Sequence, residues 1–420
     1  MWGSVIRLLP YGLLVSVLLG TGYEAGAAPG KKKRRKRPRA RTTVALTAPS
    51  PLENPGSPEF ALFAASLRDC RLRRGENPGF LLLGDSHMQC EDFGLELVRY
   101  LRDSLQIPVG GRQFVFPYPL ARTSHRSDMS FFPNRSWRGC RFTRSDESCC
   151  WGLAGWTAHC EEDTAGFFWR HNQGSFRAGD RVTVLCPPEP GRRFSLRVSD
   201  TSGRSVEMPY SDGFSGFSGV LPSAAGQLRF SLNRLEAGPG FVLQGLVVEP
   251  VLPGLRFGIS GTNGARLDHY LLNPDFQRHL RVLNPGLVMV SLGTNDVFSP
   301  GFSPEVTREA LVQLLSRIRT ALPGVAILLI GPPDHALKRR RGNPAIAALN
   351  ALYEEVAGEL DLVFWNQQKA MGGKGSVFRW RGRGLVTADM VHFTPDGYRL
   401  QARLLGRAFG TVLRLQGERR

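Results

Sequence analysis

Apolar runs of strand length alternate with helical segments in the second half of the chain. The runs cover residues 287–292, 325–330 and 362–365. Between and after them, a capping residue followed by proline marks helix starts at Asn273-Pro274, Ser303-Pro304, Asn343-Pro344 and Thr394-Pro395. Strands that alternate with helices predict a parallel sheet covered by helices on both faces.

The same rhythm occurs once near the start of the chain and ends in a long final helix. The apolar run 80–83 is followed by Gly84-Asp85-Ser86-His87 and then by apolar residues at helical spacing. This order predicts a strand, a tight turn and a helix. The final helix carries apolar residues along one face, which we expect to pack on the sheet: Tyr398, Ala402, Leu405, Phe409 and Val412.

Residues 130–250 have a different pattern. Short stretches of alternating apolar and polar residues, such as 181–185, 193–198 and 227–232, are separated by Gly, Pro, Asp and Ser. They predict antiparallel strands of a β-sandwich-like domain inserted into the α/β domain. Four tryptophans of this segment either fill the sandwich core, which is the favoured interpretation, or present faces for sugar rings: Trp137, Trp151, Trp156 and Trp169.

The N-terminal region predicts export. Arg7 precedes a short apolar stretch broken by Gly and Pro, and a small-residue cleavage site follows at Ala27 and Ala28. The alternative is an uncleaved membrane anchor, which the short apolar core disfavours. We therefore expect a secreted, periplasmic or envelope-associated protein without a transmembrane segment. The predicted division is a signal peptide (1–27), a basic disordered linker (28–58), the α/β domain in two parts (59–129 and 251–420) and the inserted domain (130–250).

Half of the chain's formal net charge of +18 comes from residues 31–41, which carry nine cations and no acid. No aromatic residue accompanies this tract, so a specific nucleic-acid partner is not expected. An anionic wall polymer or a membrane surface fits an exported chain better. A solvated linker with no specific partner is an equal alternative.

Cysteine usage agrees with export. Five of the seven cysteines lie in the inserted segment: Cys140, Cys149, Cys150, Cys160 and Cys186. We expect disulfides there, with the pairing open, and Cys70 and Cys90 could also bridge. A zinc site is the less favoured alternative, because paired Cys-x-x-Cys units are missing.

Two short strings far apart in the chain supply the groups of a serine hydrolase. Ser86 follows a predicted strand and opens a helix, while Asp389 and His392 lie three residues apart in a loop before the final helix. A serine, a carboxylate and an imidazole can act together in nucleophilic catalysis. Taken singly, Ser86 is better explained as a helix cap, and Asp389 with His392 as a surface pair.

Gly261 and Asn295 follow predicted strands and could donate to an oxyanion. Asn295 offers a side-chain amide, and Gly261 a backbone N–H that a second chain or a ligand can approach closely. The carboxyl ends of parallel strands, where ligands bind in open sheets, place such groups together. Taken singly, each residue is better explained as a turn residue.

In their order, Gly84-Asp85-Ser86, Gly261, Gly293-Thr294-Asn295-Asp296 and Asp389-Met390-Val391-His392 resemble the four blocks of the SGNH, or GDSL-type, hydrolase superfamily. The resemblance implies a three-layer α/β/α domain. It also implies Ser86 as nucleophile, His392 as base and Asp389 as its orienting partner, with the oxyanion held by Gly261, Asn295 and the Ser86 N–H. Within the superfamily the chain looks like secreted peptidoglycan O-acetylesterases, some of which carry a carbohydrate-binding-like sandwich at the place of residues 130–250.

The sequence therefore predicts a secreted serine esterase that acts on an acylated polysaccharide such as O-acetylated peptidoglycan. A preference for short acyl groups follows from the resemblance. The proposed chemistry needs no metal and no organic cofactor. The alternatives are a lipase or lysophospholipase of the GDSL type and a non-catalytic protein that binds envelope glycan.

Overall fold

The computed structural model describes residues 50–123, 127–144 and 149–415. The predicted signal peptide and the basic tract lie outside the described residues. So does the predicted linker, apart from its last nine positions. Among the helices of the described part, none combines the length and the apolar character needed to cross a bilayer.

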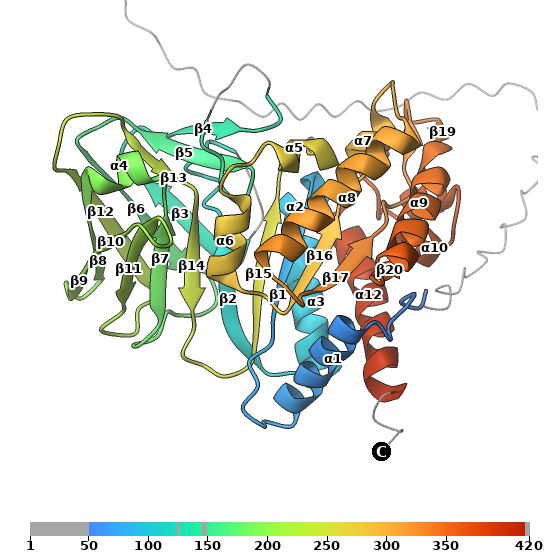
Figure 1. Cartoon of the computed structure of the whole chain (residues 1–420), viewed down its shortest axis with the longest axis horizontal. Helices are drawn as coiled ribbons and strands as arrows, with labels where there is room; N and C mark the ends of the chain where they lie inside the picture. The colour runs from blue at the N-terminus through green and yellow to red at the C-terminus, as the bar shows by residue number, and fades with distance from the viewer. Residues whose placement is uncertain (1–49, 124–126, 145–148, 416–420) are drawn as a thin grey trace, which may run out of the picture. The chain divides into compact units, whose positions relative to one another are not determined.

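A ten-stranded mixed sheet forms the centre of the fold (Figure 1). Five neighbouring pairs, from β2 to β20, are parallel, and the pairs from β10 to β2 are antiparallel. Its strands, in spatial order, are β10 (Tyr210–Ser211), β11 (Gly216–Val220), β7 (Arg181–Leu185), β14 (Gly245–Glu249), β2 (Val109–Val115), β15 (Leu255–Gly261), β1 (Gly79–Gly84), β16 (Leu287–Ser291), β17 (Ala326–Ile330) and β20 (Val363–Trp365).

Helices cover both faces of the parallel half, as the alternating pattern predicts. One face packs against α5 (Leu267–Leu271), α6 (Phe276–Leu283), α8 (Pro304–Ala321) and α9 (Ala345–Glu359). The other packs against α1 (Pro58–Arg71), α3 (Asp92–Asp103), α10 (Gln367–Ala370), α11 (Ser376–Arg381) and α12 (Pro395–Leu415). The strands serve both faces because their side chains alternate: Leu81 and Leu83 enter the first core, and Phe80 and Leu82 the second.

The predicted capping signals lie at or beside the helix starts. The Ser303 side chain accepts a hydrogen bond from the Val306 N–H at the start of α8. Thr394 accepts from the Gly397 N–H at the start of α12. All five residues predicted for the inner face of α12 are buried. This helix packs along α3, which follows the Ser86 turn.

Parallel pairing brings three turns to one edge of the sheet. β1 lies between β15 and β16, and Gly84 at its end is level with Gly261 on one side and Ser291 on the other. The chain leaves β1 into α2 (Ser86–Gln89) and leaves β16 into α7 (Thr294–Phe298). Ser86 and Asn295 therefore start from adjacent strand ends.

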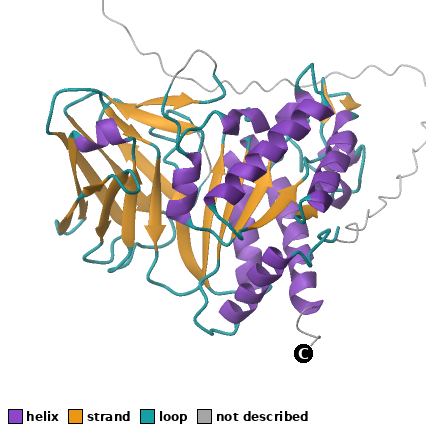
Figure 2. Cartoon of the chain, in the orientation of Figure 1, coloured by secondary structure: helices purple, strands orange, loops and turns teal. Residues whose placement is uncertain are grey.

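The inserted segment is rich in strands, as predicted, but it does not form an isolated sandwich (Figure 2). Its strands β7, β10, β11 and β14 continue the central sheet through the antiparallel pair β14–β2. The remainder forms two further sheets, with one short helix, α4 (Pro188–Arg192). Five strands make one of them: β3 (Met129–Pro133), β6 (Thr164–His171), β12 (Gln227–Arg234), β8 (Phe194–Asp200) and β9 (Ser205–Met208). Three make the other: β13 (Phe241–Leu243), β5 (Trp156–Cys160) and β4 (Arg138–Arg141).

Aromatic side chains fill the core of the insertion. Phe167 and Phe230 stack with ring centroids 4.5 Å apart, and Trp137 and Trp169 are fully buried. Trp156 is also buried, and Trp151 is partly buried against the same core. The core-filling interpretation of the tryptophans is confirmed.

The end of the predicted linker is ordered, which corrects the expectation of disorder up to residue 58. Glu53 exchanges two backbone hydrogen bonds with Phe364 of β20, and Leu52 is buried in the core. Ser57 occupies the N-cap position of α1. The cause is burial, because an apolar side chain that reaches the sheet edge offsets the entropy of ordering the segment.

Candidate active site

Ser86 and His392 lie within hydrogen-bonding distance, although 306 residues separate them in the chain. The Ser86 Oγ is 2.8 Å from the His392 Nε2. Asp85, the N-cap of α2, accepts a hydrogen bond from the His87 N–H and so fixes the turn that presents Ser86. The nucleophile and the base proposed from the sequence are in contact.

Asp389 holds the other side of the imidazole. Its Oδ2 is 2.8 Å from the His392 Nδ1, and its Oδ1 accepts from the Thr387 hydroxyl and from the N–H groups of Val391 and His392. Partial burial raises the pKa of Asp389, but these hydrogen bonds outweigh it and hold the pKa well below its usual value. The carboxylate therefore stays ionised and selects the tautomer in which Nε2 accepts the serine proton.

Asn295 lies at the start of α7, with its amide at the same edge of the sheet. Its Nδ2 donates to the Ala265 carbonyl at 2.9 Å and makes a longer contact of 3.4 Å with the Asp85 Oδ2. One hydrogen is firmly bound, and the other is held weakly enough to turn to a substrate oxygen. This geometry is compatible with the predicted oxyanion role.

Gly261 does not fit the oxyanion role that the resemblance implied. Its N–H donates to the Tyr118 hydroxyl at 3.1 Å, and its carbonyl accepts from the same hydroxyl at 2.6 Å. A Cβ at this position would meet the backbone of Asp85 and Gln89, so the glycine serves to let α2 approach β15. The residue positions the nucleophile turn and presents no N–H to the cleft.

Gly264 is the better candidate for a backbone donor. It lines the cleft beside Ser86 and Asn295, and its φ of +80° is a conformation that favours glycine. Within the described residues its N–H has no hydrogen-bond acceptor, and the same holds for the Ser86 N–H. Gly264 lies in the same Gly-rich stretch of the sequence as Gly261. Only the folded turn shows that Gly264, and not Gly261, lines the cleft.

Buried titratable groups behind the triad were missed by the sequence analysis. Burial raises the pKa of Asp85 to about 7 and that of Asp296 to about 6. Burial also lowers the pKa of His87 well below its usual value, and its Nδ1 is 3.0 Å from the Tyr398 hydroxyl. A neutral ring at His87 avoids charge repulsion with His392, whose ring centroid is 5.3 Å away.

A buried ion cluster connects the nucleophile turn with the start of the insertion. Arg112 on β2 bonds to Glu91, which follows α2, and to Asp128, which precedes β3, with 2.6 Å between the Arg112 Nη1 and the Asp128 Oδ1. A buried arginine of this kind is costly unless each partner is present. The cluster therefore ties the position of the insertion to that of α2.

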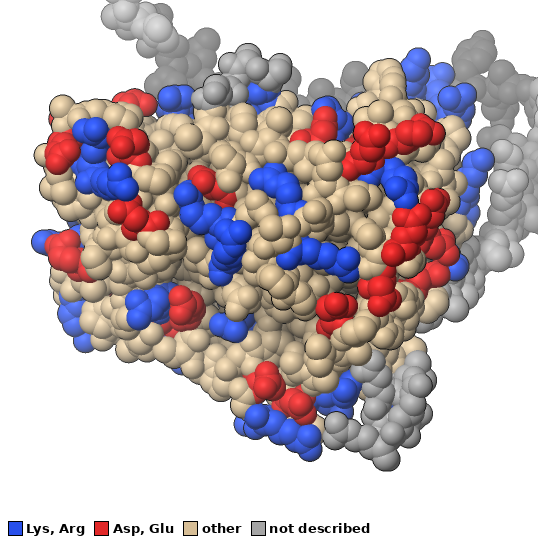
Figure 3. All heavy atoms as spheres, viewed as in Figure 1, with Lys and Arg blue, Asp and Glu red and all other residues tan. Residues whose placement is uncertain are grey.

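The triad opens into a cleft of about 520 Å³. Its lining consists of Ser86, Asn263, Gly264, Thr294, Asn295, Phe298, Ala336, Lys338, Arg339, Asp389, Val391 and His392. Only three of these side chains are apolar: Phe298, Ala336 and Val391. Lys338 and Arg339 belong to an exposed hairpin, and Figure 3 shows cationic side chains gathered where Figure 1 labels its second strand, β19.

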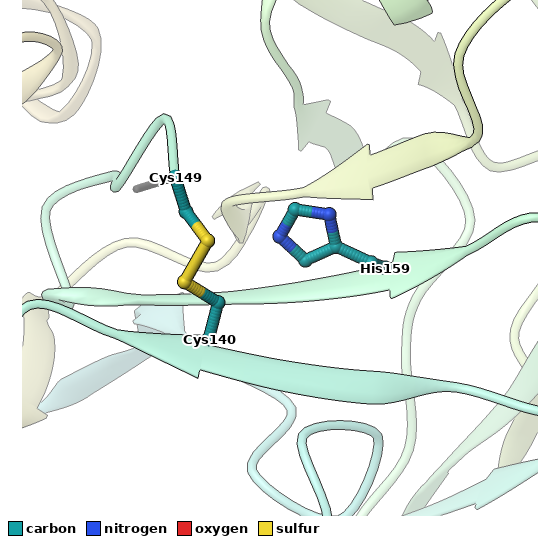
Figure 4. A group of neighbouring side chains, drawn as sticks. All are labelled: Cys140, Cys149 and His159. Carbon is teal, nitrogen blue, oxygen red and sulfur yellow. A yellow bond between two sulfur atoms is a disulfide. The ribbon is translucent and has the colours of Figure 1, made fainter. Parts of the chain in front are cut away.

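Among the described residues, one group has the composition of a metal site: Cys140, Cys149 and His159 (Figure 4). Cys140 and Cys149 form a disulfide, so their sulfurs are not thiolate ligands, and the His159 Nε2 is 2.8 Å from the Thr157 hydroxyl. The group does not fit a metal in this state. Cys70 and Cys90 are not bonded to each other, and Cys150, Cys160 and Cys186 form no disulfide within the described residues.

The family comparison agrees with the geometry. The model of the GDSL-like lipase/acylhydrolase family matches residues 233–400, which include Asn295, Asp389 and His392 but not Ser86. No curated protein matches the chain.

One solved structure shares the fold over most of the chain. A structure described as a peptidoglycan O-acetylesterase in action is 22% identical, has a TM-score of 0.70, and the match covers 86% of this chain and 97% of that one. A GDSL-like lipase from Bacteroides thetaiotaomicron is 22% identical with a TM-score of 0.31, over 37% of this chain and 76% of that one. The match to the peptidoglycan O-acetylesterase structure covers more of this chain than the two parts of the α/β domain.

Proposed function

We propose that the chain is a serine esterase of the GDSL-like lipase/acylhydrolase family, whose model matches residues 233–400, and that it removes acetyl or other short acyl groups from a cell-envelope polysaccharide. The observation that carries the proposal is the continuous set of contacts from Ser86 through His392 to Asp389 at the cleft. We name O-acetylated peptidoglycan as the first substrate to test.

In the first half of the reaction, Ser86 attacks the ester carbonyl while its proton passes to the His392 Nε2. The carbonyl oxygen becomes an anion, and we assign its stabilisation to three donors of the cleft lining: the Ser86 N–H, the Gly264 N–H and the Asn295 amide. Asp389 stabilises the imidazolium that forms. Collapse of the intermediate breaks the bond to the sugar oxygen, which leaves as an alcohol with the proton from His392.

In the second half, water takes the place of the alcohol. His392 removes a proton from the water, whose oxygen attacks the acyl-serine carbonyl. The bond to the Ser86 Oγ breaks, the serine recovers a proton from His392, and the free acid leaves. The same donors serve both oxyanions, so one cleft suffices for the whole cycle.

The composition of the cleft supports a short acyl group. Phe298, Ala336 and Val391 offer a small apolar surface, and the rest of the lining is polar or charged. A long acyl chain gains about 25 cal/mol for each Å² of apolar contact, so it needs an extended apolar channel to bind well. The fold likeness to a peptidoglycan O-acetylesterase supports a polysaccharide as the carrier of the ester.

The N-terminal sequence supports an envelope location for this activity. We propose that the signal-like segment 1–27 directs export and that the basic tract 31–41 attracts the enzyme to an anionic polymer or membrane surface. Deleting residues 28–45 and comparing sedimentation with insoluble wall material tests the second point. Unchanged binding of the shortened protein would exclude the tract as the anchor.

The decisive experiment measures acetate released from purified O-acetylated peptidoglycan and from acetylated xylan. The Ser86→Ala variant is the control, and we expect at least about a 10⁴-fold lower kcat, because it removes the nucleophile. We expect faster release from peptidoglycan than from xylan. A series of p-nitrophenyl esters is expected to give the highest kcat/KM at two to four acyl carbons.

Two outcomes would overturn the proposal. Equal rates for the protein and for Ser86→Ala would exclude an esterase at this site. A p-nitrophenyl series that peaks at long acyl chains would indicate a lipase instead of a polysaccharide esterase.

A further inference from the structure

A cationic hairpin stands at the rim of the catalytic cleft. It is formed by β18 (Ala336–Leu337) and β19 (Arg341–Gly342), and we call residues 336–342 the basic hairpin. Lys338, Arg339, Arg340 and Arg341 are exposed. The first two line the same cleft as Ser86 and His392.

Among the residues that the structure describes, these four cations have no acidic partner. In residues 50–123, 127–144 and 149–415, no ion pair involves any of them. The only carboxylate in the cleft lining is Asp389, which already binds His392 and Thr387. Other arginines of the chain pair with acids, for example Arg197 with Glu207 and Arg403 with Glu96. The cleft therefore carries a positive charge that the described part of the chain does not neutralise.

The backbone conformation of this turn does not explain why Lys338 and Arg339 occupy it. Lys338 and Arg339 both have positive φ, 48° and 62°, and the Arg340 N–H donates to the Leu337 carbonyl. A turn of this kind favours Asn and Gly, because long side chains crowd the backbone in the left-handed region. Two long cations are thus held in a strained turn beside the catalytic groups, which is where strain commonly marks function.

The base of the hairpin is fixed to the catalytic loops. The Ala336 N–H donates to the Met390 carbonyl, between Asp389 and His392 in the chain. At the other end, the Asn343 amide donates to the Val297 carbonyl of α7. The backbone of the hairpin is therefore held in place relative to both the base and the oxyanion donors, and the exposed cationic side chains start from this fixed backbone.

We propose that the basic hairpin selects esters on a polysaccharide that carries carboxylates close to the acylated sugar. This inference rests on the proposed function and names the charge of its substrate. Arg339 offers a planar guanidinium that suits a carboxylate, and Lys338 adds a second charge at the same rim. Attraction between a charged cleft and a charged polymer raises the encounter rate and lowers KM more than it changes kcat.

The test compares two polymers that differ only in charge. Polygalacturonate is first O-acetylated. One portion of this material is then amidated at its carboxyl groups, so that the same acetyl esters are carried by a charged and by a neutral polymer. The double variant Lys338→Gln/Arg339→Gln is compared with the unaltered protein. We expect it to reduce the ratio of kcat/KM for the charged over the neutral polymer by about tenfold, mainly through KM.

A matched control removes the same charge elsewhere. Arg170→Gln/Arg229→Gln takes two exposed cations from the insertion and is expected to leave the ratio between the polymers unchanged. Adding 0.5 M NaCl is expected to remove most of the preference of the unaltered protein, since exposed charges are screened.

The outcomes separate this inference from the proposed function. If the unaltered protein deacetylates both polymers equally, or if the hairpin variant keeps the preference, the inference is wrong while the esterase stands. If neither polymer is deacetylated and Ser86→Ala behaves identically, the proposed function itself fails. If the hairpin variant loses activity only on esters in anionic lipid vesicles, the cations serve a lipid headgroup and the inference is also wrong.

Discussion

The two halves of the central sheet differ in strand direction and in what they contribute to the catalytic site. In the parallel half, the chain leaves β1 and β16 at one edge, and the Ser86 and Asn295 turns follow directly. In the antiparallel half, neighbouring strands β7, β11 and β14 run in opposite directions. Parallel pairing gathers successive turns at one edge, whereas antiparallel pairing distributes them over two. This difference explains why Ser86, Gly264 and Asn295 all follow strands of the parallel half.

The two halves nevertheless share a core. The buried residues of the insertion and those of one face of the parallel half form one continuous cluster, from Phe230 through Phe114 to Val288 and Leu311. The other face has its own core beneath α1, α3 and α12. We therefore expect stability to depend on both halves and chemistry on one.

The largest expected effect comes from the aromatic core of the insertion. Phe230 is fully buried and stacks on Phe167, so Phe230→Ala should lower the free energy of unfolding by about 3–5 kcal/mol. Because the core is shared, we expect the circular dichroism signal and the esterase activity to be lost together, in a single thermal unfolding transition. At temperatures where the variant is folded, its kcat should match that of the unaltered protein.

The exposed Phe132 on β3 provides the control. Phe132→Ala should change the free energy of unfolding by less than about 1 kcal/mol. Separate transitions for the two halves in Phe230→Ala would contradict a shared core and favour an independent inserted domain.

The next effect is confined to the catalytic edge. Asn295→Ala removes an oxyanion donor and should lower kcat by about 10²–10³-fold, or about 2.7–4 kcal/mol of transition-state stabilisation. The melting temperature should fall far less than in Phe230→Ala. The exposed Asn233 of the insertion is the matched control, and Asn233→Ala should leave kcat unchanged. If kcat falls less than threefold in Asn295→Ala, the backbone N–H groups alone would form the oxyanion site.

The smallest expected effect is a pH dependence of the free energy of unfolding, caused by the buried Asp85 behind the triad. Because burial raises the pKa of Asp85 to about 7, the folded state binds this proton more tightly than the unfolded chain. The free energy of unfolding should therefore fall by about 2 kcal/mol between pH 5 and pH 8. Asp85→Asn keeps the cap to the His87 N–H and should reduce this slope to the smaller part that the raised pKa of Asp296 contributes, which denaturant titrations at several pH values measure. An unchanged slope would show that other groups cause it.

The alternating α/β pattern was sufficient for the class of fold, and the ordered short motifs were sufficient to name Ser86, Asp389 and His392, which the structure brings together. Runs of apolar residues and Asn-Pro, Ser-Pro and Thr-Pro signals act locally, so β16, β17, α8 and α12 were predicted close to their observed bounds. The continuity of the insertion with the central sheet was not predictable. The β14–β2 pair joins strands more than a hundred residues apart, and an alternating stretch does not specify its partner.

The chain by itself determined which groups are available for chemistry: an alcohol after β1, an amide after β16, and a carboxylate with an imidazole before α12. Tertiary structure decided which of them meet. It set Ser86 against His392, turned the Gly261 N–H to Tyr118 and left Gly264 facing the cleft beside Lys338 and Arg339. The physical reason is that residue type and spacing act over one turn or one strand, whereas a catalytic distance of 2.8 Å is fixed by how separate strands pair and pack.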